Sequence, residues 1–175
     1  MNDVIHAMQD RRSCRKFAAT PVPRELVEQV VDAGLWAPSG KGGQAPIIIA
    51  VTNPDLRNRI AEANRAIGGW KEGFDPFYGA PVILIVLASK EWPTYQYDGS
   101  LVLGNLMLAA HSLGLGSIWI HRAKQEFESD EFKALLAELG IEGDYEGIGH
   151  CALGYIEGEL SRGAARKEGR VFWAE

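Results

Sequence analysis

Four cationic side chains are packed into six residues near the start of the chain. They lie in the segment Arg11-Arg12-Ser13-Cys14-Arg15-Lys16, in a protein whose formal net charge is −5. The planar guanidinium group of arginine suits a two-point contact with phosphate, and a serine hydroxyl is a further hydrogen-bonding partner. Arg11 and Arg15 would share one face if the segment were helical. This basic cluster, residues 11–16, therefore favours a compact anion such as one phosphate group. The alternative is a solvated charged surface.

A glycine-rich loop, APSGKGGQAP at residues 37–46, is the second stretch that could hold a ligand. No Ser or Thr follows Lys41, so the loop is not a nucleotide-binding P-loop. It lies between a predicted helix and a predicted strand, which is the reverse of the order in a dinucleotide-binding fingerprint. Two interpretations stay open: a flexible connector, or a backbone that approaches a flat ligand closely because glycine lacks a side chain.

Other reactive residue types form no recognised catalytic or metal-binding pattern. The histidines are not spaced as metal ligands, no GxSxG motif is present, and neither cysteine belongs to a CxxC pair. We therefore predict no metal site. Trp119 and His121 would lie on the same face of a strand that begins near Gly116. The histidines and cysteines of the chain are His6, His111, His121, His150, Cys14 and Cys151.

The hydrophobic pattern predicts alternating helices and strands that must position these residues. Apolar, β-branched runs predict strands at residues 46–51, 80–89, 116–120 and within 147–156. Helical spacing and caps predict helices at residues 23–34, 53–67, 99–113 and 130–139, with Asn53, Asp98 and Ser129 as amino-terminal caps. Taken alone, this alternation suggests a parallel α/β sheet.

Length and composition limit the class of protein. The 175 residues, 46% hydrophobic and 23% charged, are typical of one globular domain, which we expect to span residues 1–175. No apolar run approaches the ~20 residues of a membrane-spanning helix, and no signal peptide is recognisable, so we expect a cytoplasmic protein without a membrane partner. The acidic balance argues against nucleic acid as a partner.

Taken together, six motifs resemble the FMN-dependent nitroreductase family. In chain order they are RRSCRKF, GLWAPSGKGGQ, FYGAPVILIV, NLMLAAHSLGLGSIWI, GHCALGY and RKEGRVFW. The resemblance implies an α+β fold with a mainly antiparallel central sheet flanked by helices, and this expectation replaces the parallel sheet. It also implies an intertwined homodimer with two FMN sites at the subunit interface. The C-terminal segment would be exchanged onto the sheet of the partner.

The resemblance also assigns cofactor-binding roles to individual residues. Residues of the basic cluster would contact the phosphate and ribityl chain of FMN, and a tail arginine would reach the same phosphate. The loop would lie against the flavin ring of the other subunit, and the strand end would lie beside the pyrimidine edge of the ring. In this order the residues are Arg11, Arg12, Ser13, Arg15 and Arg166; Pro38, Ser39, Gly40 and Gly42; and Trp119, Ile120 and His121.

Three further positions complete the comparison with the family pattern. Asn64 corresponds to a family asparagine that contacts the ring. Gly42 stands where the family loop often has an asparagine, and Ala164 stands where a tail lysine is expected. We therefore expect one ring contact and one phosphate charge to be missing, which leaves Arg11, Arg15 and Arg166 to hold the phosphate.

The implied activity is hydride transfer from NADH or NADPH to flavin N5, followed by reduction of a nitroaromatic or quinone acceptor in a ping-pong cycle. The chemistry would belong to the cofactor, so the resemblance implies no catalytic side chain. An aromatic, glycine-rich loop at residues 68–79 is predicted to cover the acceptor pocket, with Trp70, Phe74, Phe77 and Tyr78 as its lining. Two alternatives stay open. One is another redox task in the same fold, such as reductive dehalogenation, ene reduction or oxidation of a dihydro ring. The other is a flavin-binding protein without enzymatic activity.

Overall fold

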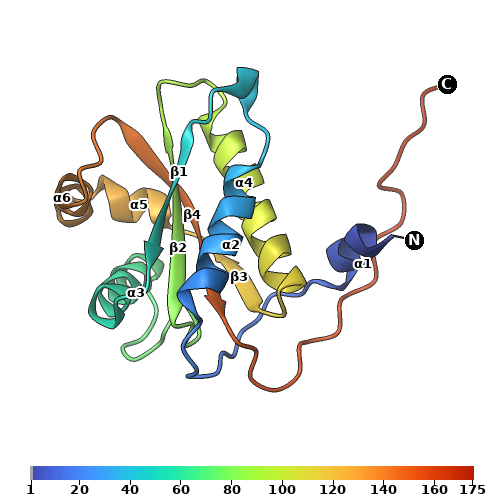
Figure 1. The fold of residues 1–175 in the computed structure, drawn as a ribbon, viewed down its shortest axis with the longest axis horizontal. Helices are drawn as coiled ribbons and strands as arrows, with labels where there is room; N and C mark the ends of the chain where they lie inside the picture. Colours follow the sequence, from blue (N-terminus) through green and yellow to red (C-terminus); the bar gives the residue numbers. More distant parts are fainter. Residues whose placement is uncertain (1) are drawn as a thin grey trace.

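The centre of the structure is a four-stranded sheet with the strand order β1-β2-β4-β3 (Figure 1). The computed structural model describes residues 2–175. All three strand pairings are antiparallel, so the α+β fold implied by the resemblance is confirmed. The parallel sheet suggested by alternation alone is wrong, because the order of elements along a chain does not reveal strand direction. The strands are β1 (Pro46–Val51), β2 (Val82–Ser89), β3 (Gly116–Ile120) and β4 (Tyr145–Gly154).

Helices cover both faces of this sheet. Helices α2 and α4 pack on one face, and α3, α5 and α6 pack on the other (Figure 1). The helices are α1 (Asp3–Asp10), α2 (Arg24–Leu35), α3 (Pro54–Gly68), α4 (Tyr95–Ser112), α5 (Ala123–Glu128) and α6 (Asp130–Glu138), with a short 3₁₀ turn, η1 (Gly40–Gly42). Within residues 2–175, none of these helices is long and apolar enough to cross a bilayer.

Two of the three predicted helix caps are confirmed. The Asn53 side chain accepts a hydrogen bond from the Leu56 backbone N–H at the start of α3, and the Ser129 hydroxyl accepts one from Phe132 at the start of α6. Asp98 is not a cap, because α4 begins earlier, at Tyr95. This buried carboxylate instead lies in the first turn of α4, where it is free to bind another segment.

Strand β2 divides the hydrophobic core into two clusters. It is a central strand covered on both sides, so nearly all its side chains are buried. Ile83 and Ile85 point toward α3, α5 and α6, whereas Leu84 and Val86 point toward α2 and α4. Because β2 and β4 fill the centre, β3 is left at one edge of the sheet, where a further segment can lie against it.

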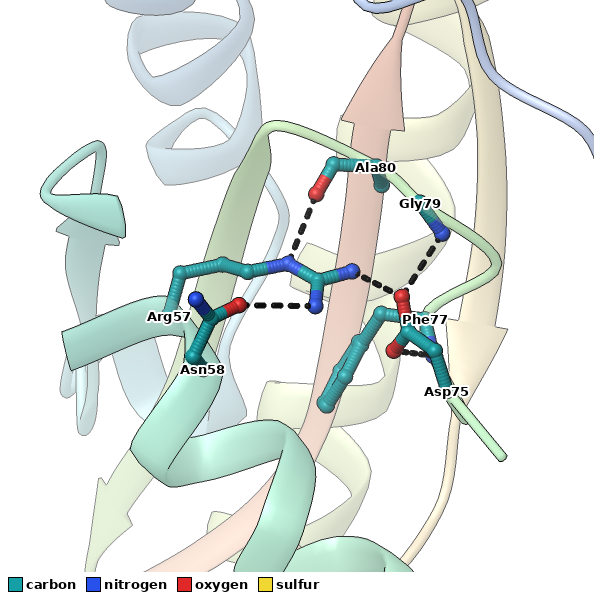
Figure 2. Close-up of polar contacts among 6 residues, drawn as sticks. All are labelled: Arg57, Asn58, Asp75, Phe77, Gly79 and Ala80. Atoms are coloured by element: carbon teal, nitrogen blue, oxygen red, sulfur yellow. Dashed lines mark hydrogen bonds and ion pairs between the residues drawn. The ribbon is translucent and has the colours of Figure 1, made fainter. Parts of the chain in front are cut away.

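A partly buried ion pair fixes the second half of the loop between α3 and β2. Figure 2 shows the Arg57 guanidinium group of α3 donating hydrogen bonds to the Ala80 carbonyl, at 3.0 Å, and to the Asp75 carboxylate. The same carboxylate accepts hydrogen bonds from the backbone N–H groups of Phe77, at 2.9 Å, and Gly79, at 2.8 Å. Residues 75–80 are thus fixed to α3.

We expect Asp75→Ala to lower the free energy of unfolding by about 2 kcal/mol. The substitution leaves the Arg57 guanidinium, whose side chain is only 11% exposed, without its charged partner, and it also removes two backbone contacts. Urea denaturation measures the change. Glu28→Ala, which breaks the solvent-exposed pair between Arg24 and Glu28, is the matched control and should change little. Equal stability of the two variants would contradict the pinning role.

Candidate functional site

The outer edge of β3 presents unpaired backbone groups next to the basic cluster. The Cys14 N–H donates to the Ser117 carbonyl at 2.9 Å, and Ser13 forms a parallel bridge with Ser117. The backbone polar groups of Ser117 therefore point away from β4, and alternation along the strand directs those of Trp119 and the N–H group of His121 the same way. Within residues 2–175, the structure describes no partner for the N–H group of Trp119 or His121. The end of β3 is thus an open row of hydrogen-bonding groups.

The basic cluster is extended rather than helical, since α1 ends at Asp10. The segment is therefore not helical, but Arg11 and Arg15 can still lie on one side of it. In an extended chain, alternate residues share a side, so Arg11, Ser13 and Arg15 can act together. Cys14, between them, is buried in the core.

Arg11 carries the strongest local sign of an anion site. Its side chain is partly buried, and its Nη1 atom is buried without a hydrogen-bond partner in the part of the chain that the structure describes. A buried, unpaired cationic donor is unfavourable unless a ligand satisfies it. Ser13, Arg15 and Lys16 line a cavity of about 190 Å³ between this segment and the beginning of the tail.

The other two cations of the cluster are already engaged. Arg12 Nη1 donates to the Gln9 carbonyl at 2.5 Å and to the Arg11 carbonyl at 2.8 Å, so its guanidinium folds back on the chain. Lys16 pairs with Glu157 at 3.0 Å. Arg11 and Arg15 are therefore the cations available to an anion.

The strand end that was predicted to lie beside a ring has the expected geometry. The rings of Trp119 and His121 are 5.5 Å apart, so their predicted placement on one face is confirmed. Trp119 is 47% exposed, whereas the Ile120 side chain belongs to the core and offers only its backbone. Gly149, on the neighbouring strand, makes room for Trp119, because a Cβ atom at Gly149 would lie 2.5 Å from the indole nitrogen.

A row of side chains continues from this strand end to the aromatic loop. The guanidinium of Arg122 lies over the Trp70 ring, 4.3 Å from its centroid. The Trp70 and Phe74 rings are 5.1 Å apart, and the Phe74 and Tyr78 rings are 6.2 Å apart. Three of the predicted pocket residues are therefore together and connected to the strand end. Sequence reasoning missed Arg122, whose left-handed backbone (φ 86°) turns the chain there.

Two predicted site residues are placed in the core instead. Phe77 is fully buried, with its ring 5.2 Å from that of His150, so its prediction as a pocket residue is wrong. Asp75 binds the Phe77 backbone, and this pin directs the ring inward (Figure 2). Asn64 is also fully buried, and its amide nitrogen donates to the His121 carbonyl at 2.8 Å. A direct ring contact by Asn64 is therefore wrong, although its partner belongs to the site.

The glycine-rich loop is fixed to the amino-terminal end of α4. The Gly40 N–H donates to the Asp98 carboxylate at 3.0 Å, and the Thr94 hydroxyl donates to the same carboxylate at 3.0 Å. A Cβ atom at Gly40 would lie 2.2 Å from the Thr94 hydroxyl, so only glycine permits this close approach. The Ser39 hydroxyl accepts from Gln44 at 3.0 Å. The loop is thus held in shape by its own contacts, and Pro38 and Gly42 remain exposed on it.

The loop and the tail arginine do not meet the basic cluster within this chain. Asp98, the anchor of the loop, lies about 14 Å along α4 from Met107, whose carbonyl accepts from the Ser117 hydroxyl at 3.5 Å. Arg166 is exposed on the extended tail and makes no ion pair or hydrogen bond within residues 2–175. Within one chain, the loop, the tail arginine and the basic cluster therefore lie apart from one another.

Neither thiol is a candidate nucleophile. Burial raises the pKa of the Cys151 thiol to about 12, although the nearby Arg11 opposes part of the shift. Burial likewise raises the pKa of Cys14, whose Sγ donates to the Lys16 carbonyl at 3.0 Å. Since the thiolate is the reactive form, both side chains are unreactive near neutral pH.

The antiparallel sheet with helices on both faces makes this an α+β protein, with the arginine cluster and the aromatic loop near its open edge strand. The model of the Nitroreductase family matches residues 8–155, so the chain belongs to this family. An FMN-bound nitroreductase from Bacteroides fragilis superimposes with a TM-score of 0.88 at 28% identity, covering 100% of both chains. Oxidised iodotyrosine deiodinase bound to FMN and 3-iodo-L-tyrosine shares the fold, with a TM-score of 0.76 at 20% identity over 98% of this chain and 99% of that one.

Two curated relatives are longer than this chain. The FMN reductase [NAD(P)H] of Bacillus subtilis is 28% identical over 140 residues, 67% of this chain and 53% of the relative. A Methanothermobacter thermautotrophicus protein, provisionally named NADH dehydrogenase/NAD(P)H nitroreductase, is 33% identical over 121 residues, 67% of this chain and 60% of the relative. The chain thus spans little more than half the length of these two relatives.

We expect Asp98→Ala to release the glycine-rich loop. Without the carboxylate, the Gly40 N–H loses a hydrogen bond to a charged group, so its amide should exchange with solvent at least ~tenfold faster. Hydrogen exchange read by NMR measures this. Asp98→Asn is the matched control, because an amide oxygen can still accept from Gly40. Unchanged exchange in the alanine variant would show that the loop is held by other contacts.

Proposed function

We propose that the protein is an FMN-dependent oxidoreductase that uses NADH or NADPH to reduce nitroaromatic or quinone acceptors in a ping-pong cycle. The flavin chemistry supplied at this site would be hydride acceptance from the nicotinamide and electron delivery to the acceptor. The FMN-bound relative with 28% identity and the NAD(P)H-dependent FMN reductase support this assignment. A single domain over residues 1–175 and a cytoplasmic location belong to the same proposal.

The observation that carries the proposal is the alignment of a phosphate-type site with an open strand edge. Arg11 offers a buried, unpaired guanidinium nitrogen, and Ser13 is bridged directly to β3. Two residues farther along the same edge from Ser117, the N–H group of Trp119 is open, and His121 follows. An elongated ligand with a phosphate at one end and a polar ring at the other fits this row.

The chain's own residues would bind and orient the cofactor rather than transfer protons. Arg11, Ser13 and Arg15 would hold the phosphate with charge-assisted hydrogen bonds. Backbone N–H groups at the end of β3 would face the polar edge of the ring, where they stabilise negative charge. Trp70, Phe74 and Tyr78 would form an apolar surface for flat acceptors, with Arg122 at its border. No side chain needs to act as a catalytic acid or base.

A homodimer would bring the separated parts of the site together. Large apolar side chains are exposed on α1, at the end of α2, on α4 and on the tail, and a second copy of the chain would cover them. In such a dimer the loop at residues 38–42 of one subunit would serve the flavin of the other. The exchanged tail would bring Arg166 to a phosphate. The exposed residues are Val4, Ile5, Met8, Leu35, Trp36, Tyr97, Leu101, Val171, Phe172 and Trp173.

One purification tests the proposed function. We expect yellow protein that releases FMN on denaturation and is bleached anaerobically by NADH or NADPH, with colour returning when a nitroaromatic or quinone acceptor is added. A colourless protein that cannot be reconstituted with FMN would exclude the proposal. Bound flavin with no turnover for any donor and acceptor would instead support a binding protein, and turnover with other acceptors only would support another redox task.

We expect Arg11→Ala or Arg15→Ala to weaken FMN binding roughly tenfold to a hundredfold. Each substitution removes a charged hydrogen bond to the phosphate, worth about 1.5–3 kcal/mol. Quenching of flavin fluorescence gives the dissociation constant. Arg24→Ala, which removes an exposed cation from α2, is the matched control for net charge and should bind normally. Wild-type affinity in both cluster variants would mean that the cluster is only a solvated surface.

We expect Phe74→Ala and Tyr78→Ala to change the preference among acceptors. These rings border the row that starts at the strand end, so their loss should raise KM for large aromatic acceptors more than for small ones. Steady-state kinetics with a series of acceptors of graded size measures the effect, and FMN affinity serves as the internal control. Unchanged KM values across the series would remove this loop from the acceptor pocket.

A further inference from the structure

Three polar side chains form a fully buried hydrogen-bonded network behind the end of β3. The carboxylate of Glu126, on α5, accepts from the Asn64 amide at 2.6 Å and contacts His150 Nε2 at 2.8 Å. Asn64 comes from the last turns of α3 and His150 from β4. Asn64, Glu126 and His150 are each 0% exposed. Sequence reasoning assigned no role to Glu126 or His150.

The network is neutral overall, which lets it stay buried. His150 Nδ1 donates to the Ile120 carbonyl at 3.3 Å, so that nitrogen carries a proton. Its contact with Glu126 then pairs either an imidazolium with a carboxylate or a neutral ring with a protonated carboxyl group. Both arrangements contain the same protons and no net charge. Apolar side chains would nevertheless fill the space without the desolvation penalty of these groups. The burial of three polar side chains here therefore suggests a role other than packing.

The network ends on two consecutive backbone carbonyls of the candidate site. His150 holds the Ile120 carbonyl, and Asn64 holds the His121 carbonyl at 2.8 Å. In a planar trans peptide, the carbonyl and the following N–H point in opposite directions. The N–H groups of His121 and Arg122 are therefore directed away from the network, and neither donates to another group within residues 2–175.

We infer that Asn64, Glu126 and His150 are positioning residues for the cofactor. By fixing two carbonyls on the core side, they aim two successive N–H groups at the polar edge of the flavin ring. Donors fixed in this way stabilise the negative charge of the reduced ring without reorganising. The inference rests on the proposed function for the identity of the ligand, but the fixing of the strand end is a property of the protein alone.

Substitutions of Glu126 can separate the effect of its charge from the effect of its hydrogen bonds. In Glu126→Gln the amide oxygen can still accept from Asn64, and the amide nitrogen can donate to His150 Nε2, so the chain to Ile120 is preserved. In Glu126→Ala both contacts are lost. Asn64→Ala is a milder second variant, because it releases the His121 carbonyl and leaves the pair of Glu126 and His150 in place. Leu135→Ala, which leaves a cavity in the core at α6 and removes no hydrogen bond to the strand end, is the control for lost stability.

The test measures the midpoint potential of bound FMN and the backbone motion of the apo protein in full-length variants. In Glu126→Ala we expect affinity for reduced FMN to fall about tenfold more than affinity for oxidised FMN, which lowers the two-electron midpoint potential by about 30 mV. Asn64→Ala should shift it in the same direction by less. Glu126→Gln should resemble the wild type. In ¹⁵N relaxation dispersion, residues 119–123 should show new microsecond-to-millisecond exchange in Glu126→Ala and Asn64→Ala, but not in Glu126→Gln or in the control Leu135→Ala.

A purely structural network would give a different pattern. If Asn64→Ala, or a Glu126→Ala protein that folds, loses thermal stability as Leu135→Ala does but keeps the wild-type potential and a rigid strand end, the inference is wrong. If Glu126→Gln shifts the potential as much as Glu126→Ala, hydrogen-bond positioning is also wrong. A wild-type protein that takes up no FMN would contradict the proposed function. The relaxation data would then decide alone whether the network fixes the strand end.

Discussion

The hydrogen-bonding alternation of β3 is the constraint on which the candidate site depends. β4 pairs with one edge of β3, and the segment at Ser13 and Cys14 pairs with the other edge at Ser117. These pairings fix which backbone groups of β3 face outward, and a shift by one residue would reverse them all. The same shift would take the Trp119 ring away from Gly149 and Ile120 out of the core. The burial of β3 side chains and the orientation of its open N–H groups are therefore set by a single register.

Beyond the last ladder pair, backbone alternation alone no longer controls the chain, and the buried network takes over. Arg122 has a left-handed backbone, so the peptide between His121 and Arg122 is not oriented by the sheet. Asn64 supplies the missing constraint by binding the His121 carbonyl from α3. This explains why a polar group from a distant helix is buried here at a cost in desolvation, where an apolar side chain would pack but could not orient a peptide.

Much of the fold, and less of the site, could be predicted from the sequence. Strand positions and the shared face of Trp119 and His121 follow from periodicity, a local property of the chain. Phe77 was misplaced because its environment is decided by Arg57 and Asp75, which are far apart in sequence (Figure 2). The roles of Glu126 and His150 could not be found either. Glu126 lies in a charged stretch and His150 in an apolar one, and neither pattern indicates that the two side chains are partners. Arg122 offered no signal, because neither periodicity nor a motif reports its left-handed turn.

In the proposed homodimer, the subunit interface and the cofactor site would coincide, because the loop and the basic cluster of one chain are separated. If a single chain formed the whole site, the fixed shape of the loop at Gly40 would have no purpose within it, because no described contact joins the loop to β3's open edge. Its rigidity is instead what a neighbouring subunit would need, since a preformed surface loses little conformational freedom on binding. The tail has the opposite character: Val171, Phe172 and Trp173 are exposed, and in the proposed dimer a second chain would cover them. Exchange of the loop and the tail between subunits would make cofactor binding and dimer formation mutually dependent, because each subunit would hold the flavin with residues that only the assembled pair brings together.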